Sequence, residues 1–136
     1  MESMEPVKFS KAESEFILKN EVCRLASITP DGKPHVVPIC YIYHDGYFYM
    51  VTDLGTAKLR NIKNNPEVSV LIDTYKPNKA VLLWGRADVL TEGEEFKEVS
   101  NLFFKKFYWA RMDRWDEGEA AIIKFKPVKK VAWGLK

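Results

Sequence analysis

The chain has 136 residues, and 46% of them are hydrophobic, which fits one globular domain able to bury a core. Its 21 Lys and Arg residues nearly balance 19 Asp and Glu residues, giving a formal charge of +2. The cations are scattered, and the densest run is only Lys124 to Lys130. We expect a single domain over residues 1–136. Because nucleic-acid-binding proteins concentrate cations on one face, we also expect that it binds no nucleic acid.

The sequence also predicts the compartment. No stretch approaches the roughly 20 apolar residues of a membrane-spanning helix, and the segment Met1 to Lys11 lacks the apolar run of a signal peptide. We therefore expect a cytoplasmic protein without a membrane segment.

The first half of the chain reads as a helix followed by an antiparallel sheet. Ser10 and Glu13 form a capping-box pattern that predicts a helix to about Asn20. Three β-rich runs follow, over residues 22–29, 34–43 and 47–52, separated by Pro-Asp-Gly and His-Asp-Gly turns. Such tight turns join antiparallel neighbours, so we expect a three-stranded meander.

Two cysteines lie on these runs. They have no metal-ligand spacing with the two histidines, which argues against a metal site. If Asp31 and Gly32 form a two-residue turn, Cys23 faces Cys40 across the ladder, where a disulfide is geometrically conceivable. In a reducing compartment we favour the interpretation of two free core thiols.

The middle run is apolar on both faces. Val37, Ile39, Tyr41 and Tyr43 project to one side, and Val36, Cys40 and Ile42 to the other. An antiparallel sheet is apolar on both sides where a helix, a ligand or a second subunit covers the outer face. Pro38 lacks a ladder donor and so indicates an edge or a bulge, with free backbone groups that suit a planar heterocycle. A plain sheet edge explains the same residues.

The second half alternates further helices and strands. Residues 56–65 read as a short helix with Leu59 and Ile62 inward, followed by strands over 67–73 and 80–90. Gly85 within the second of these strands indicates a bulge or a close backbone approach. A capping box at 91–94 predicts the start of a helix with the core residues Phe96, Val99, Phe103 and Phe107. The stretch 108–118 has no clear period and reads as a helix end and a loop, for which a subunit contact is one place. Closing strands are expected over 120–126 and 129–135.

The strongest local site lies at residues 52–61, where a strand ends, Gly55 turns the chain and a helix begins. Exposed N–H groups at a helix start, threonine hydroxyls and the cation of Lys58 suit a phosphate. Thr56 as a simple cap with Lys58 in solvent explains the pattern equally well. His35 on a strand suits either a structural or a ligand-contacting role.

Nothing in the sequence assigns a catalytic residue. Ser, His and Asp are present without an elbow motif or paired-carboxylate spacing. An anion-binding site without an identifiable general acid and base fits a cofactor that performs its own redox chemistry.

The combined pattern resembles a known family. It consists of Cys-Arg-Leu-Ala-Ser before Pro-Asp-Gly-Lys-Pro, then His-Val-Val-Pro at 35–38, then Thr-Ala-Lys-Leu-Arg-Asn-Ile at 56–62 before Asn-Pro. These motifs resemble the pyridoxamine 5'-phosphate oxidase-like, FMN-binding split barrels. The resemblance implies a mainly β fold, a six-stranded antiparallel Greek-key split barrel with flanking helices, acting as a homodimer with flavin sites between subunits.

The resemblance also implies roles for particular residues. Lys58 would hold the cofactor phosphate, helped by Thr52, Thr56 and Arg60 or Asn61. The flavin ring would lie along His35, Val36, Val37, Pro38 and Ile39. Trp84 and Arg86 would approach from the partner subunit, and Trp133 would wall the ring.

The chain departs from true pyridoxamine phosphate oxidases, which makes a vitamin B6 substrate doubtful. They carry an Arg-rich strand where this chain has His-Val-Val-Pro, and Ser-Arg-Lys where it has Thr-Ala-Lys. The expected function is an FMN-dependent oxidoreductase acting on a small substrate or electron acceptor. The alternatives are a reductase using the deazaflavin coenzyme F-420, and a carrier of flavin or haem without turnover.

Overall fold

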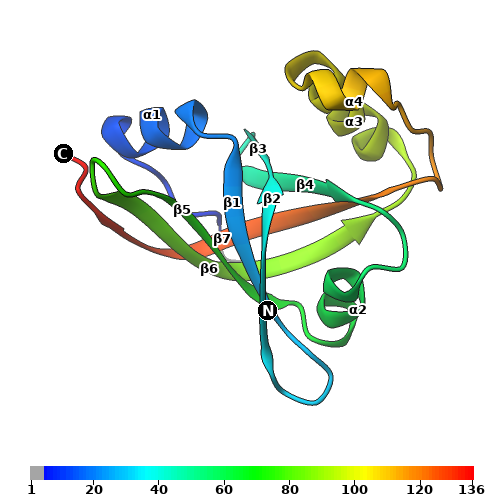
Figure 1. Cartoon of the computed structure of the whole chain (residues 1–136), viewed down its shortest axis with the longest axis horizontal. Helices are drawn as coiled ribbons and strands as arrows, with labels where there is room; N and C mark the ends of the chain where they lie inside the picture. Colours follow the sequence, from blue (N-terminus) through cyan, green and yellow to red (C-terminus); the bar gives the residue numbers. More distant parts are fainter. Residues whose placement is uncertain (1–4) are drawn as a thin grey trace.

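A computed structural model describes residues 5–136 as one curled antiparallel sheet with four helices around it (Figure 1). The resemblance to a mainly β split barrel is confirmed. In chain order the elements are α1 (Lys11–Lys19), β1 (Val22–Ile28), β2 (Pro34–Cys40), β3 (Ile42–His44), β4 (Tyr47–Thr52), α2 (Ala57–Asn64), β5 (Glu67–Thr74), β6 (Lys79–Leu90), α3 (Glu94–Lys106), α4 (Tyr108–Met112) and β7 (Ala121–Trp133).

The sheet has seven strands in the order β2-β1-β5-β6-β7-β4-β3, so the expected count of six was wrong. The run 34–43 breaks at Tyr41 into two strands. β2 pairs with β1 at one edge of the sheet, and β3 pairs with β4 at the other. The expected three-stranded meander was therefore wrong, because β2 does not pair with β4. The chain passes through Tyr41 from one edge of the sheet to the other, and the barrel is split between β2 and β4.

The β1–β2 ladder differs by one residue from the expected register. Val22 pairs with Cys40, and Cys23 pairs with Ile39, because the turn closes on a Thr29 N–H to Lys33 carbonyl bond around a three-residue loop. A shift of one residue moves a side chain to the opposite face. Cys23 and Cys40 consequently point to opposite faces and both are free thiols, so a disulfide between them was the wrong alternative.

The closing strand is continuous through Pro127, whereas two strands were expected. Trp84 on β6 pairs with Lys129, while the next residue, Gly85, pairs with Pro127, so one β7 residue bulges out. A bulge tolerates proline within a sheet. A Cβ at Gly85 would lie 1.9 Å from the carbonyl oxygen of Lys126, which confirms the expected close backbone approach.

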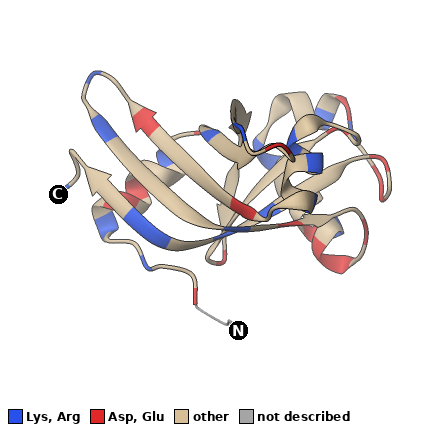
Figure 2. Cartoon of the chain, turned by 90° about the horizontal axis from the view of Figure 1, so that it is seen from below, with Lys and Arg blue, Asp and Glu red and all other residues tan. Residues whose placement is uncertain are grey.

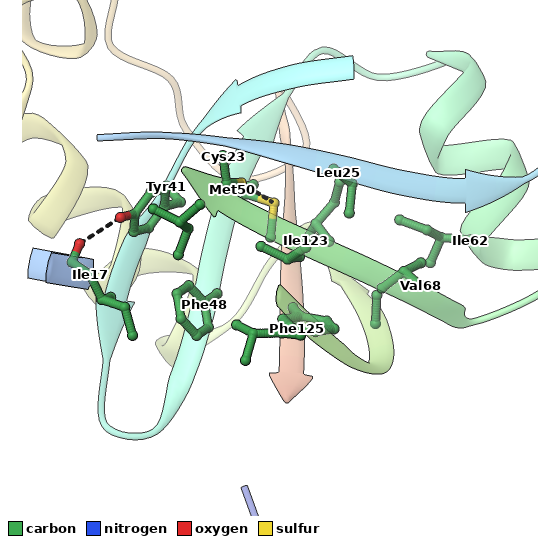
Figure 3. Packing of buried hydrophobic residues seen from close by; sticks show 14 of the residues in the cluster. Ile17, Cys23, Leu25, Tyr41, Phe48, Met50, Ile62, Val68, Ile123 and Phe125 are labelled. Atoms are coloured by element: carbon green, nitrogen blue, oxygen red, sulfur yellow. Dashed lines mark hydrogen bonds between the residues drawn. The ribbon is translucent and has the colours of Figure 1, made fainter. Parts of the chain in front are cut away.

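The barrel interior is a continuous apolar core (Figure 3). α1 begins with the expected capping box, in which the Glu13 N–H donates to Ser10 Oγ and the Ser10 N–H to Glu13 Oε1. The helix closes one end of the barrel, and Ile17 accepts a 2.5 Å hydrogen bond from the buried Tyr41 hydroxyl. Burial raises the pKa of the Cys23 thiol to about 12, so this thiol stays protonated and behaves as a core residue.

A second apolar cluster lies between α3 and the outer face of β3, β4 and the first half of β7. It contains all four expected core residues of this helix. The helix start was predicted wrongly. The N-cap residue is Gly93, which has no side chain to form a capping box, and its N–H donates to Glu117 Oε2 at 2.6 Å. A carboxylate from a distant loop thus replaces the expected capping box.

The rest of the outer face carries exposed apolar side chains. Val36 on β2, Trp84 on β6 and Val131 on β7 are 64%, 38% and 45% exposed. The pairing register sets Leu71, Leu82 and Val131 side by side across β5, β6 and β7. One face of the sheet is therefore covered by α3 and α4 over only part of its width.

The charges follow the expectation from composition. Figure 2 shows Lys and Arg distributed over the elements and interleaved with Asp and Glu. Within the described residues no helix is long and apolar enough to cross a membrane.

Candidate functional site

A cleft of about 640 Å³ lies where the sheet is split. One side, the strand wall, combines β2, the end of β4 and the first turn of α2. Its residues are Pro38, Ile39, Val51, Thr52, Asp53 and Lys58. The rest of the lining, here called the α4 wall, comes from α4 and the segment that follows it: Trp109, Asp113, Arg114, Trp115, Glu119 and Ala120.

The start of α2, where an anion seat was predicted, borders the cleft. Lys58 lines the cleft together with Thr52, and its side chain is half-buried. Thr56 is the N-cap, but its hydroxyl makes no capping bond, and its buried Oγ1 has no hydrogen-bond partner among the described residues. Arg60 donates to the Gly55 carbonyl at 2.7 Å and so braces the turn. A buried hydroxyl without a partner costs stability unless a ligand or water satisfies it.

The β2 residues of the predicted set divide between two places. Pro38 and Ile39 line the cleft. His35 and Val37 share the inner face with Ile39 by register, and His35 Nδ1 is buried without a partner in the described structure. Val36 points to the exposed outer face.

Besides His35, Val36, Val37, Thr56 and Arg60, four further predicted residues do not line this cleft. Asn61 is buried, and its side chain donates to Ser27 Oγ at 3.1 Å, which ties α2 to β1. Trp84, Arg86 and Trp133 lie on the sheet strands β6 and β7, where they are exposed. Their predicted contact with a cofactor requires a second subunit and stays a prediction.

The α4 wall was not predicted from the sequence: residues 108–118 were expected to form a helix end and a loop, with a subunit contact as one place for them. The segment is tied firmly to α3. Trp115 Nε1 donates to Ser100 Oγ at 2.8 Å, and Arg111 donates to the Phe104 and Lys105 carbonyls at 3.0 and 2.9 Å. The only local signal was two tryptophans among charges in a stretch without periodicity.

The lining of the cleft is rich in groups that bind ligands. Its lining holds hydroxyl, cationic, carboxylate and indole groups, but no Ser, Cys or His that could serve as a nucleophile or a base near neutral pH. In residues 5–136 no three His, Cys, Asp or Glu side chains are grouped so that they could hold a metal ion. The arrangement suits a phosphorylated ligand with a flat ring.

The family comparison agrees with these features. The sequence model described as Pyridoxamine 5'-phosphate oxidase matches residues 9–133. The chain belongs to this family. A comparison with curated protein sequences finds no significant match.

Solved structures with this fold carry several functions in their names. A pyridoxamine 5'-phosphate oxidase-related, FMN-binding protein of Nostoc punctiforme has 11% identity and a TM-score of 0.72, with coverage of 93% of this chain and 86% of that one. The haem storage protein HutZ of Vibrio cholerae has 14% identity and a TM-score of 0.74, with coverage of 90% and 91%. An F420 reductase has 19% identity and a TM-score of 0.70, with coverage of 91% and 98%. At these identities the likeness concerns the fold alone.

Proposed function

We propose that the protein is an FMN-dependent oxidoreductase whose cleft holds the cofactor at its strand wall. The observation that carries the proposal is the convergence of Lys58, Thr52 and the start of α2 beside Pro38 and Ile39 in one cleft of about 640 Å³. Ligand pockets of this size accommodate cofactor-sized molecules.

The residues present fit a phosphate group. The first N–H groups of α2 lack helical partners, and the positive end of the helix favours an anion. Thr56 Oγ1, buried without a partner among the described residues, has a free hydroxyl to donate. Gly55 holds the turn before the helix with a φ of +78°, a conformation that residues with a side chain rarely adopt.

Each residue then has a stated task. Lys58 and the two threonines bind and orient the phosphate, and Arg60 holds the turn in shape through the Gly55 carbonyl. Pro38 and Ile39 provide an apolar wall from which water is excluded. The bound flavin itself supplies hydride transfer, which explains why the cleft needs no acid–base team.

The exposed part of the outer sheet face supports a homodimer. Val36, Trp84 and Val131 would be largely removed from water by a second copy, and soluble monomers rarely expose extended apolar patches. Such a dimer would also bring Trp84, Arg86 and Trp133 toward the partner's cofactor, as the family resemblance implies. The backbone of residues 35–37 would continue from Pro38 along the ring, and Asn61 would support the seat indirectly by tying α2 to β1.

Cofactor identity is tested by the absorbance of the purified protein. FMN gives the yellow flavin spectrum, the deazaflavin coenzyme absorbs at shorter wavelength, and haem gives a Soret peak. F420 is the stated alternative because it shares the phosphate end of the site. Oxidation of reduced nicotinamide by the FMN-loaded protein under air then separates an enzyme from a carrier. Failure of FMN to bind in a direct titration would contradict the proposal.

A further inference from the structure

The α4 wall of the cleft presents a flat aromatic surface that the phosphate seat does not use. Trp109 is 44% exposed and lines the cleft. Its ring stacks on Phe107, with centroids 5.2 Å apart and planes 27° apart, and lies nearly parallel to Trp115 at 6.5 Å. These two nearly parallel neighbours fix the orientation of the ring, and the exposed part of Trp109 stays accessible from the cleft.

This wall is anchored by hydrogen bonds although α4 has only five residues. A single helical turn is not stable alone in water. The bonds from Trp115 to Ser100 and from Arg111 to the end of α3 hold it in place. Glu117 adds a second anchor, accepting from the Gly93 N–H and pairing with Lys97 at 3.4 Å. A ring that stacks on Trp109 meets a surface already ordered, which lowers the entropy cost of binding.

The two walls differ in the ligand groups that they favour. The strand wall has the Lys58 cation and the Thr52 hydroxyl, which suit an anion, beside the carboxylate of Asp53, whereas an indole face attracts a flat ring. Arg114, on the α4 wall, carries only hydrogen-bond donors and lies over the Phe104 ring at 4.7 Å. Its N–H groups suit carbonyl oxygens on a ring stacked beside it.

We propose that Trp109 and Arg114 form a substrate subsite for a planar quinone-type ring, stacked on the indole with its oxygens accepting from the guanidinium. The inference rests on the proposed function, because the cofactor seat leaves the α4 wall to the substrate. It concerns binding, and its test needs no turnover.

The test is equilibrium dialysis with duroquinone, whose methylated ring does not add thiols. Protein saturated with FMN should bind duroquinone, and cyclohexane-1,4-dione, which has no π face, should bind far more weakly. Trp109→Leu should weaken duroquinone binding about tenfold, the value of a lost aromatic stack with its buried area. Arg114→Gln should weaken it severalfold. Tyr108→Leu is the matched control, since Tyr108 is 68% exposed on the same helix but does not line the cleft.

Three results overturn the subsite. The first is that Trp109→Leu binds duroquinone with wild-type affinity, and the second is that FMN displaces duroquinone. The third is that Trp109→Leu lowers the affinity for FMN as strongly as the affinity for duroquinone. In the last case Trp109 belongs to the cofactor wall, and the proposed function stands. If FMN binds nowhere, the proposed function fails, while the dialysis of FMN-free protein still tests stacking on Trp109. If Trp109→Leu does not fold, Trp109→Phe replaces it and should bind with intermediate affinity; wild-type affinity would contradict the proposal.

Discussion

Removing the Lys58 cation gives the sharpest test of the cofactor seat. Lys58 lies in the first turn of α2 and lines the cleft with its side chain half-buried. A hydrogen bond to a charged group contributes about 1.5–3 kcal/mol, so Lys58→Ala should weaken FMN binding about 10- to 150-fold. Binding should persist, because the helix terminus retains about 0.3–1 kcal/mol of attraction for the phosphate.

Two assays measure this loss. Titration of FMN fluorescence gives the dissociation constant directly. Thermal unfolding gives it through linkage: at 100 times the wild-type dissociation constant, FMN should stabilise the wild type by about 2.7 kcal/mol and a tenfold weaker variant by about 1.4 kcal/mol. Without FMN the two proteins should unfold alike, since Lys58 lies outside the buried core.

Lys63→Ala is the matched control. Lys63 is exposed in the last turn of the same helix, away from the seat, so its removal should leave FMN affinity unchanged. The reasoning is refuted if Lys58→Ala binds FMN as tightly as the wild type does, or if both variants lose affinity equally.

Three further outcomes test the fold and assembly. Gly85→Ala forces a Cβ against a backbone carbonyl and should cost about 3 kcal/mol or more in urea unfolding; a loss below 1 kcal/mol would contradict the close approach. Light scattering should show a dimer that Val131→Glu dissociates, whereas Leu18→Glu, at a comparably exposed site on α1, should leave it intact. Glu95→Gln should cost about 0.5–1 kcal/mol at pH 7, a modest value because solvent screens this half-exposed carboxylate, and the difference from wild type should vanish in unfolding curves as the pH falls below 4.5.

The sign of that pH dependence follows from the surroundings of Glu95. Burial by itself would raise the pKa of this carboxyl, but the hydrogen bonds from Lys124 and Tyr49 and the Lys124 charge bring it below its ordinary value of 4.5. A carboxylate with a lowered pKa in the folded state stabilises the fold above the unfolded pKa. Protonation at lower pH removes that contribution.

Local signals in the sequence predicted much of the sheet. The capping box of Ser10 and Glu13 depends only on residues three apart in the chain, and the close backbone contact at Gly85 needs only a residue without a side chain. Both predictions are confirmed. The break at Tyr41 was not predictable locally, because both flanking runs are β-rich and only tertiary pairing sends them to opposite edges. Likewise, Pro127 predicts the end of a strand from the sequence, whereas in the structure the bulge opposite Gly85 accommodates it within β7.

The candidate site divides along the same line. Lys58 and Thr52 stand next to a turn and a helix start, so their spacing along the chain already implies a shared seat. Trp109 and Arg114 reach the cleft only because α3 packs on the outer face and carries α4 across the split. Aromatic residues in an aperiodic segment suit a core, a surface or a site equally well, and packing alone distinguishes these.

The single-residue joint at Tyr41 determines how the split can widen. Its ring is buried, its hydroxyl is bonded to Ile17, and its N–H donates to the Glu21 carbonyl, so the two sheet edges are held together at this point. If β2 moves away from β4, the displacement should therefore be smallest next to Tyr41 and should increase along β2 toward its other end. Pro38 and Ile39 lie two to three residues from that joint, so this part of the strand wall should keep its distance from β4, while the hairpin tip at residues 29–33 should move most.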